Sequence, residues 1–183
     1  YSIILTCVLI LSSCGHSSDK KIKVAASSIP HAEILEFIRP DLTEQNIELE
    51  IVVIDDFNLP NRALAEKEVD ANFFQHLPFL ESQIADFGYP LESLVAMHVE
   101  PMALYSKKYQ TLHSIKDGST IAIPNDVSNQ ARALLLLEKY GWITLKSQGA
   151  KVGLIDIVSN PHGLKFIEMD SPLLSRALDD VDA

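Results

Sequence analysis

Phe74, Gln75 and His76 place two hydrogen-bonding side chains directly after an aromatic ring. They close a mostly apolar stretch, residues 69–74, which is typical of a buried strand in a parallel sheet. Ligands bind at the carboxyl ends of such strands in open α/β sheets, so this tripeptide is a candidate binding site. A purely structural interpretation stays open, in which the aromatic rings belong to the core and His76 is a satisfied polar group.

Arg132 is a second candidate, because it falls in the first turn of a helix predicted over residues 130–140. A cation there opposes the helix dipole, which favours negative charge at the N-terminal end. An anionic ligand shared between the guanidinium and the helix N-terminus would compensate for this placement. The alternative is an ion pair with a nearby carboxylate such as Asp126.

Acid–base or metal chemistry would need a cluster of titratable side chains, and such an enzyme is one alternative function. The candidates lie at separate strand ends and are His31, His76, Asp55 and Asp56. The sequence contains neither a recognisable Ser-His-Asp pattern nor an HExxH motif. We therefore predict a binding protein that is not an enzyme and that holds no cofactor and no metal.

Strands and helices alternate in the hydrophobic pattern between residues 21 and 86. Predicted strands cover residues 21–27, 47–54 and 69–74. Predicted helices run from Ser28 or Pro30 to a break at Pro40, and over residues 62–67 and 77–86. A helix between every pair of strands implies a parallel sheet with right-handed crossovers.

The pattern changes after residue 90. Two strand-like runs, 94–99 and 102–105, follow each other without a helix, which is typical of a crossover into a second domain. Beyond them we predict strands at 120–124 and 164–167 and helices at 130–140, 154–159 and 173–178. Val181-Asp182-Ala183 repeats Val69-Asp70-Ala71, so we expect a further strand to begin there and the chain to be truncated.

The acidic balance of the chain excludes one class of partner. Its formal net charge is -10 over 183 residues. Proteins that bind nucleic acid usually gain affinity from a basic surface that releases counterions, and no basic stripe is present here. We therefore expect no nucleic-acid partner.

The N-terminal residues predict processing rather than folding. Residues 3–11 form an apolar run that is too short to span a bilayer and is typical of a signal peptide. The run ends in Leu11-Ser12-Ser13-Cys14, which matches the bacterial lipobox. We therefore expect a signal peptide over residues 1–14, lipid on Cys14 and a polar tether over residues 15–21. The alternative is a general secretory signal with a chance cysteine.

Five segments of the chain resemble a known family: residues 30–35, 59–64, 70–76, 122–126 and 132–137. The most specific is 70–76, Asp-Ala-Asn-Phe-Phe-Gln-His. In these segments the chain is similar to the methionine-binding lipoproteins of bacterial ABC importers, the MetQ or NlpA type. The resemblance implies an α/β periplasmic-binding-protein fold, type II-like, with parallel-rich sheets and helices on both faces. Lobe 1 would cover residues 22–99, and lobe 2 residues 100–183, truncated before the return crossover.

The resemblance also implies roles for individual residues. Phe57, Phe74 and His76 would pack around a methionine side chain, and Arg132 would pair with the ligand carboxylate. Relatives commonly have Tyr at the position of Phe57, so a polar contact to the ligand is missing here. Family asparagines that hold the ligand's polar groups would lie beyond residue 183.

The expected partners follow from the same resemblance. They are L- or D-methionine or a related small amino acid, an ABC permease with its ATPase and, through Cys14, the membrane. The expected location is the bacterial cell envelope, with the protein facing the periplasm or the cell exterior. The alternative outside transport is a surface lipoprotein that acts as an adhesin and shows no saturable binding of a small molecule.

Overall fold

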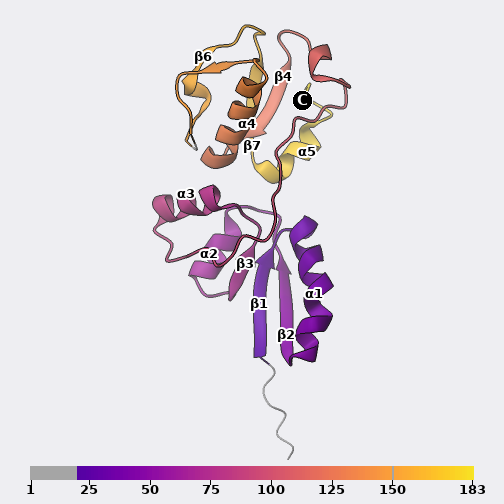
Figure 1. Ribbon diagram of the computed structural model, residues 1–183, viewed down its shortest axis with the longest axis vertical. Coiled ribbons are helices and arrows are strands. Elements are labelled where there is room, and N and C mark those ends of the chain that lie inside the picture. Colours follow the sequence, from indigo (N-terminus) through magenta and orange to yellow (C-terminus); the bar gives the residue numbers. More distant parts are fainter. Residues whose placement is uncertain (1–19, 150) are drawn as a thin grey trace, which may run out of the picture.

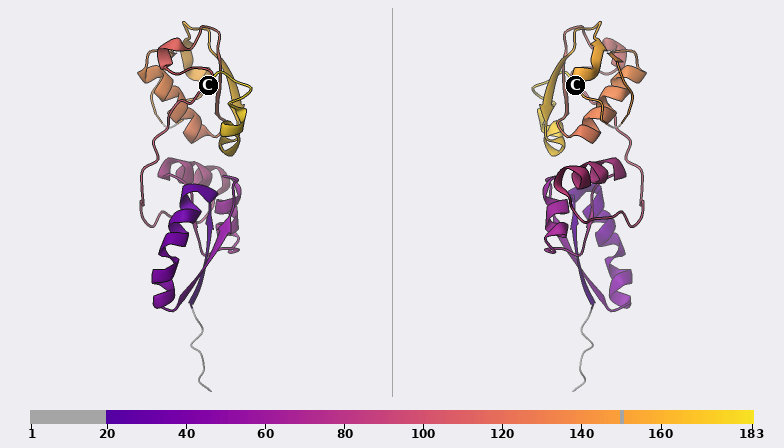
Figure 2. Two further views of the ribbon diagram at one scale, coloured as in Figure 1. Left: turned by 90° about the vertical axis from the view of Figure 1, so that its right-hand side faces the viewer. Right: turned by 90° about the vertical axis from the view of Figure 1, so that its left-hand side faces the viewer.

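The computed structural model describes residues 20–149 and 151–183. These residues form two lobes joined by an extended segment (Figures 1 and 2). Cys14, the signal peptide and most of the tether lie outside the described residues, so the predicted lipidation stays a prediction. Within the described ranges, every helix is either too short or too polar to cross a membrane.

The first lobe is built on a parallel sheet of three strands in the order β2-β1-β3. Its elements are, in chain order, β1 (Lys20–Ala26), α1 (Glu33–Glu44), β2 (Ile47–Val53), α2 (Leu59–Ala65), β3 (Ala71–Phe73) and α3 (Leu77–Phe87). The predicted alternation of strands and helices and the parallel pairing are confirmed.

The C-terminal half of strand β1 is buried on both faces because helices cover the sheet from two sides. Val24 and Ala26 pack with Leu35 of α1, whereas Ala25 packs on the opposite face with Ala63 of α2. Successive side chains of a strand point to opposite faces, so a strand covered on both sides must be apolar at consecutive positions. This explains the apolar Val24-Ala25-Ala26 run.

The predicted helix break at Pro40 is wrong, since α1 continues through it to Glu44. Proline removes one hydrogen bond to the carbonyl four residues earlier, here that of Glu36. Both Glu36 and Pro40 are exposed, so water can satisfy this carbonyl. Ile38 and Leu42, on the other side of the helix, pack against the sheet and keep the last turn in place.

The second lobe has a smaller parallel pair, β4 (Thr120–Pro124) with β7 (Lys165–Met169), and an antiparallel pair, β5 (Thr144–Leu145) with β6 (Ile157–Ser159). Two helices, α4 (Val127–Lys139) and α5 (Leu174–Ala177), complete it. The buried core consists mainly of Ile121, Ile123, Leu134, Leu137 and Trp142. Residues 120–124 and 164–167 therefore form strands as predicted, with the second running on to Met169.

Two predictions in this lobe need correction. Residues 154–159 are not a helix but a single turn followed by β6, because β-branched Ile157 and Val158 favour the strand that pairs with β5. Helix α4 begins three residues earlier than predicted, since the Asp126 carboxylate accepts the backbone N–H of Asn129 at 2.9 Å and caps the helix.

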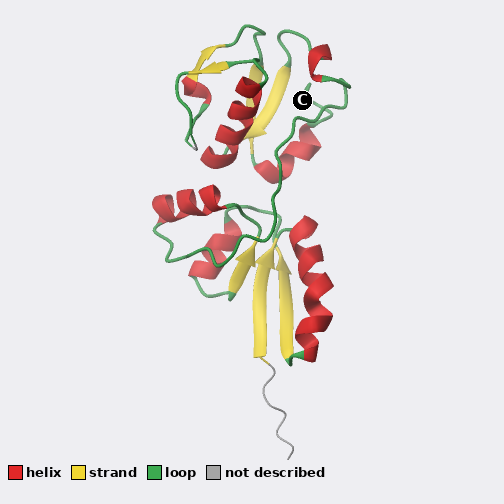
Figure 3. Cartoon of the chain, in the orientation of Figure 1, coloured by secondary structure: helices red, strands yellow, loops and turns green. Residues whose placement is uncertain are grey.

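The crossover segment, residues 88–111, connects α3 to the second lobe and contains no strand (Figure 3). The prediction of strands at residues 94–99 and 102–105 is therefore wrong. An apolar run forms a strand only where a neighbouring strand supplies hydrogen bonds, and none does so in the described part of the chain. Residues 182 and 183, by contrast, bond to β4 through the Asp182 N–H and the Thr120 carbonyl at 2.9 Å.

A buried amide network fixes the end of β3 against α2. Asn61 is fully buried, and its Nδ2 donates to Gln75 Oε1 at 2.8 Å. Its Oδ1 accepts from Asn72 Nδ2 at 2.9 Å and from Gln75 Nε2 at 2.6 Å. Gln75, predicted as a site residue from its position, therefore holds the backbone that carries Phe74 and His76.

We predict that Asn61→Ala lowers the free energy of unfolding by about 1–3 kcal/mol, because Asn72 and Gln75 lose hydrogen-bond partners inside the protein. Urea denaturation followed by circular dichroism measures this change. Gln110→Ala, at an exposed position of the crossover segment, is the control and should change the stability by less than about 0.5 kcal/mol. Equal denaturation midpoints for both variants would contradict the role of the network.

Candidate functional site

One cavity brings together all four residues predicted to bind a ligand. Phe57, Phe74, His76 and Arg132 line a space of about 250 Å³. The first three come from the first lobe and Arg132 comes from α4 in the second, so the cavity lies between the lobes. A wider opening of about 850 Å³ shares three of these four residues, all but His76.

The parallel sheet explains why residues from separate loops meet here. Phe57 lies in the loop after β2 and Phe74 directly follows β3, and parallel strands end at the same edge of a sheet. Asp56 shapes the first loop, because its Oδ1 accepts the backbone N–H groups of Asn58 at 2.7 Å and Leu59 at 3.1 Å. These bonds shape the turn that leads into α2, and Phe57 in this turn lines the cavity.

Three phenylalanine rings form an aromatic wall, defined here as Phe57, Phe74 and Phe79. The ring centroid of Phe57 lies 6.0 Å from that of Phe74 and 6.2 Å from that of Phe79, and those of Phe74 and Phe79 are 6.0 Å apart. Tilted and edge-on pairs at such distances are favourable aromatic geometry. Phe79 was not predicted as a site residue, because an apolar residue in the first turn of a helix is typical of the core.

His76 has a defined tautomer in this structure. Its Nδ1 accepts the backbone N–H of Phe79 at 3.3 Å and caps α3. A neutral imidazole that accepts at one nitrogen carries its proton on the other. Nε2–H therefore donates to Asn129 Oδ1 at 2.8 Å, which is a hydrogen bond between the two lobes.

Arg132 donates to two oxygen atoms that carry no full charge. Its Nη1 contacts Asn129 Oδ1 at 3.0 Å and its Nη2 contacts the Glu100 carbonyl at 2.8 Å. Guanidinium has five N–H donors, so three remain after these bonds. Among residues 20–149 and 151–183, no carboxylate forms an ion pair with Arg132.

The placement argument for Arg132 was wrong, although the residue does face the cavity. Because α4 begins at Val127, Arg132 is its sixth residue, and the dipole effect is confined to the first turn. The alternative ion pair with Asp126 is also not formed. The Asp126 carboxylate instead accepts from Ser171 Oγ at 3.0 Å and from Asn129 Nδ2 at 3.0 Å.

The proposed acid–base cluster of His31, His76, Asp55 and Asp56 is not assembled. Asp55 Oδ1 accepts the Ser28 backbone N–H at 2.9 Å, and Asp56 Oδ1 accepts the Asn58 backbone N–H at 2.7 Å. His76 forms a hydrogen bond with Asn129. His31 instead lies beside His98 and Glu100 of the crossover segment. The pKa of His31 is lowered, and burial of its side chain is the largest cause. The charge of Glu100 acts in the opposite direction, and His98 lowers the pKa further.

Two further cavity residues, Asn129 and Glu100, were missed by the sequence predictions. Asn129 lies in the first turn of α4 and contacts both His76 and Arg132. Glu100 lies between the two runs, 94–99 and 102–105, that were predicted as strands. The one local feature of the sequence at Glu100 is the proline that follows it. A proline indicates an irregular segment and does not identify a binding residue.

Comparisons with known proteins agree with this geometry. Residues 22–183 match the model of the NlpA lipoprotein family. The methionine-binding lipoprotein MetQ of Bacillus subtilis strain 168 is 40% identical over 96% of this chain and 67% of its own length. The D-methionine-binding lipoprotein MetQ of Salmonella typhimurium is 42% identical over 94% of this chain and 65% of its own.

A solved structure shows the same fold. The periplasmic substrate-binding protein of an ABC transporter from Coxiella burnetii superposes with a TM-score of 0.83 and 44% identity, over 88% of this chain and 68% of its own. The chain thus spans about two thirds of the length of these relatives. Its fold is that of the two-lobed α/β periplasmic binding proteins, and the chain belongs to the NlpA lipoprotein family.

Proposed function

We propose that this chain belongs to the substrate-binding protein of a bacterial ABC importer and binds methionine, or a related small amino acid, between its lobes. The observation that carries the proposal is Arg132, a cation without a carboxylate partner among the described residues, facing an aromatic wall across one cavity. The names of the relatives, a methionine-binding lipoprotein and a periplasmic substrate-binding protein of an ABC transporter, support it.

The charged end of the ligand would bind at Arg132. An amino acid carries a carboxylate, and guanidinium binds carboxylates through two parallel N–H donors. Asn129 and the Glu100 carbonyl hold the guanidinium by one bond each and leave donors for the ligand. The positive charge is thus already oriented before the ligand arrives, which lowers the entropic cost of binding.

The apolar end of the ligand would lie on the aromatic wall. A thioether sulfur at the edge of an aromatic ring gains about 0.3–1.5 kcal/mol per contact. Phe74 is buried and Phe57 only partly so, which leaves the Phe57 ring with a free face towards the cavity. Since Phe57 carries no hydroxyl, the selectivity of the wall for methionine would come from packing and sulfur contacts alone.

His76 would act on the ligand mainly through its neighbours. Both of its ring nitrogens already have partners, the Phe79 N–H and Asn129 Oδ1. The centroid of its ring lies 6.3 Å from that of Phe79 in an edge-on arrangement, so the imidazole lies beside the aromatic wall. Its hydrogen bond to Asn129 in turn sets the position of Arg132.

The remaining parts of the proposal follow from the family. The two lobes would be residues 22–99 and 100–183, and closure around the ligand would shield it from water. The protein would be tethered to the cell envelope by lipid on Cys14, and it would deliver its ligand to an ABC permease and its ATPase. An adhesin without transport function would show no saturable binding of amino acids.

We predict that Arg132→Ala weakens the binding of L-methionine by about 2–5 kcal/mol, or at least about 30-fold in Kd, because the ligand carboxylate loses its charged partner. Isothermal titration of the lipid-free protein measures both affinities. Arg62→Ala is a matched control, since Arg62 is exposed and forms an ion pair with Glu66, the residue directly after α2.

Two outcomes would contradict this prediction in different ways. Equal affinity of the wild type and Arg132→Ala would refute the carboxylate site but keep methionine as the ligand. Absence of binding of any amino acid to the wild type would refute the proposed function.

We predict that Phe57→Leu lowers the preference for L-methionine over L-norleucine by roughly twofold to tenfold, because norleucine replaces the sulfur by a methylene group. Competition titrations of both amino acids against the wild type and the variant measure the preference. Phe37→Leu is the control, as Phe37 is 83% exposed on α1. An unchanged preference in Phe57→Leu would show that this ring does not contact the sulfur.

A further inference from the structure

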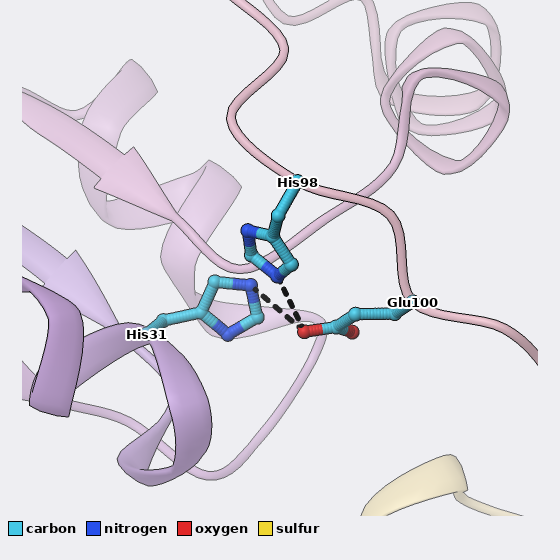
Figure 4. Close-up of side chains that lie close together, drawn as sticks. All are labelled: His31, His98 and Glu100. Atoms are coloured by element: carbon cyan, nitrogen blue, oxygen red, sulfur yellow. Dashed lines mark hydrogen bonds and ion pairs between the residues drawn. The ribbon is translucent and has the colours of Figure 1, made fainter.

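A cluster of three metal-binding side chains lies where the crossover segment touches the first lobe. It consists of His31, His98 and Glu100, whose donor atoms all lie within 4.8 Å of one another. Figure 4 shows both imidazole rings pointing at the carboxylate of Glu100. We propose that these three side chains bind a divalent transition-metal ion of the Zn²⁺ class and thereby fasten the crossover segment to the first lobe.

The donor set and its distances suit zinc. Two imidazoles and one carboxylate are a zinc ligand set, usually completed by a water molecule. Bond lengths of about 2.0–2.2 Å place neighbouring ligand atoms of a tetrahedral site roughly 3.3–3.6 Å apart. His31 Nε2 lies 3.5 Å from Glu100 Oε1, and His98 Nε2 lies 2.7 Å from the same atom. Of these two distances only the second must lengthen, and residues 98 and 100 lie outside any helix or strand.

The surroundings hold the two rings in a binding orientation. Ser27 Oγ lies 2.6 Å from His31 Nδ1, so with the Nδ1 proton donated to Ser27 the lone pair of Nε2 points at the cluster. A hydrogen bond at the second nitrogen is the usual support of a metal-bound histidine. The Phe73 ring packs edge-on against both imidazoles, with centroids 4.5 Å from His31 and 5.6 Å from His98.

An ion can also reach the cluster. The His31 side chain is buried at 7% exposure, whereas those of His98 and Glu100 are 29% and 50% exposed. All three residues line the cavity between the lobes, so a water molecule can occupy the fourth position of the metal. The site therefore has one fixed ligand in the lobe and two ligands on the segment that would close over the ion.

A metal here would act on the crossover segment and, through it, on Arg132. His31 leads into α1, whereas His98 and Glu100 belong to the segment that joins the lobes. The backbone carbonyl of Glu100 accepts from Arg132 Nη2. A bound ion would thus connect the first lobe to the crossover segment and, through the Glu100 carbonyl, to the guanidinium of Arg132 in α4. The proposal does not depend on which amino acid, if any, binds in the cavity.

The test is the titration of Zn²⁺ into the chelator-treated protein by isothermal calorimetry, with Co²⁺ absorption as a probe of the coordination geometry. We expect one zinc ion per chain, a cobalt spectrum typical of tetrahedral coordination and a higher melting temperature with metal. Ser27→Ala should weaken zinc binding by about 10–100-fold, and His98→Ala and Glu100→Gln should weaken it further. His113→Ala, at an exposed position outside the cluster, is the matched control and should bind like the wild type.

Two results would overturn the proposal. One is that the wild type takes up no zinc, and the other is that His98→Ala and Glu100→Gln bind zinc as tightly as the wild type. Both variants change exposed side chains of the crossover segment, so the fold should survive. Circular dichroism of the metal-free variants checks this, and the cobalt spectrum separates a cluster site from ions on the acidic surface.

Discussion

The hydrogen bond between His76 and Asn129 is the interaction on which the geometry of the candidate site depends. It joins the N-terminus of α3 in the first lobe to α4 in the second. Neither side chain can turn freely, because His76 Nδ1 caps α3 and Asn129 Nδ2 is held by Asp126. Loss of the Asn129 side chain would leave the half-buried His76 Nε2–H without this acceptor, which costs about 1–3 kcal/mol.

The same bond determines where the positive charge of the cavity lies. Asn129 Oδ1 accepts from both His76 and Arg132, so the two side chains are held by one atom. The aromatic wall lies in the first lobe and lines the same cavity as Arg132. Strand β3 and the amide network of Asn61 hold it in position. A ligand with an anionic end and an apolar end can contact both parts only by touching both lobes. A ligand of this kind would therefore favour an arrangement that keeps the two lobes together.

The crossover segment has a greater structural role than its lack of secondary structure indicates. Glu100 contacts Arg132 through its backbone carbonyl and the two histidines through its carboxylate. Irregular backbone exposes carbonyl groups that a strand would use in pairing, and this makes the contact to Arg132 available. The segment is thus at once the connection between the lobes and part of the cavity that they enclose.

The sequence by itself determined the local features of this protein. Hydrophobic alternation indicated the three parallel strands of the first lobe, and the residues after the third strand were placed at the ligand-binding edge because parallel strands end together. The strand-end argument found Phe74 and His76, whereas Phe57 came from the family resemblance alone. Arg132 came from that resemblance and from a dipole argument that the structure does not support. All four residues line one cavity. Only the tertiary structure decided what each of them contacts. Helix α1 runs through Pro40 because packing of Ile38 and Leu42 outweighs one lost bond. The partners of Arg132, and the meeting of His31 with Glu100, depend on how two lobes and a strandless segment pack, and no local pattern encodes that arrangement.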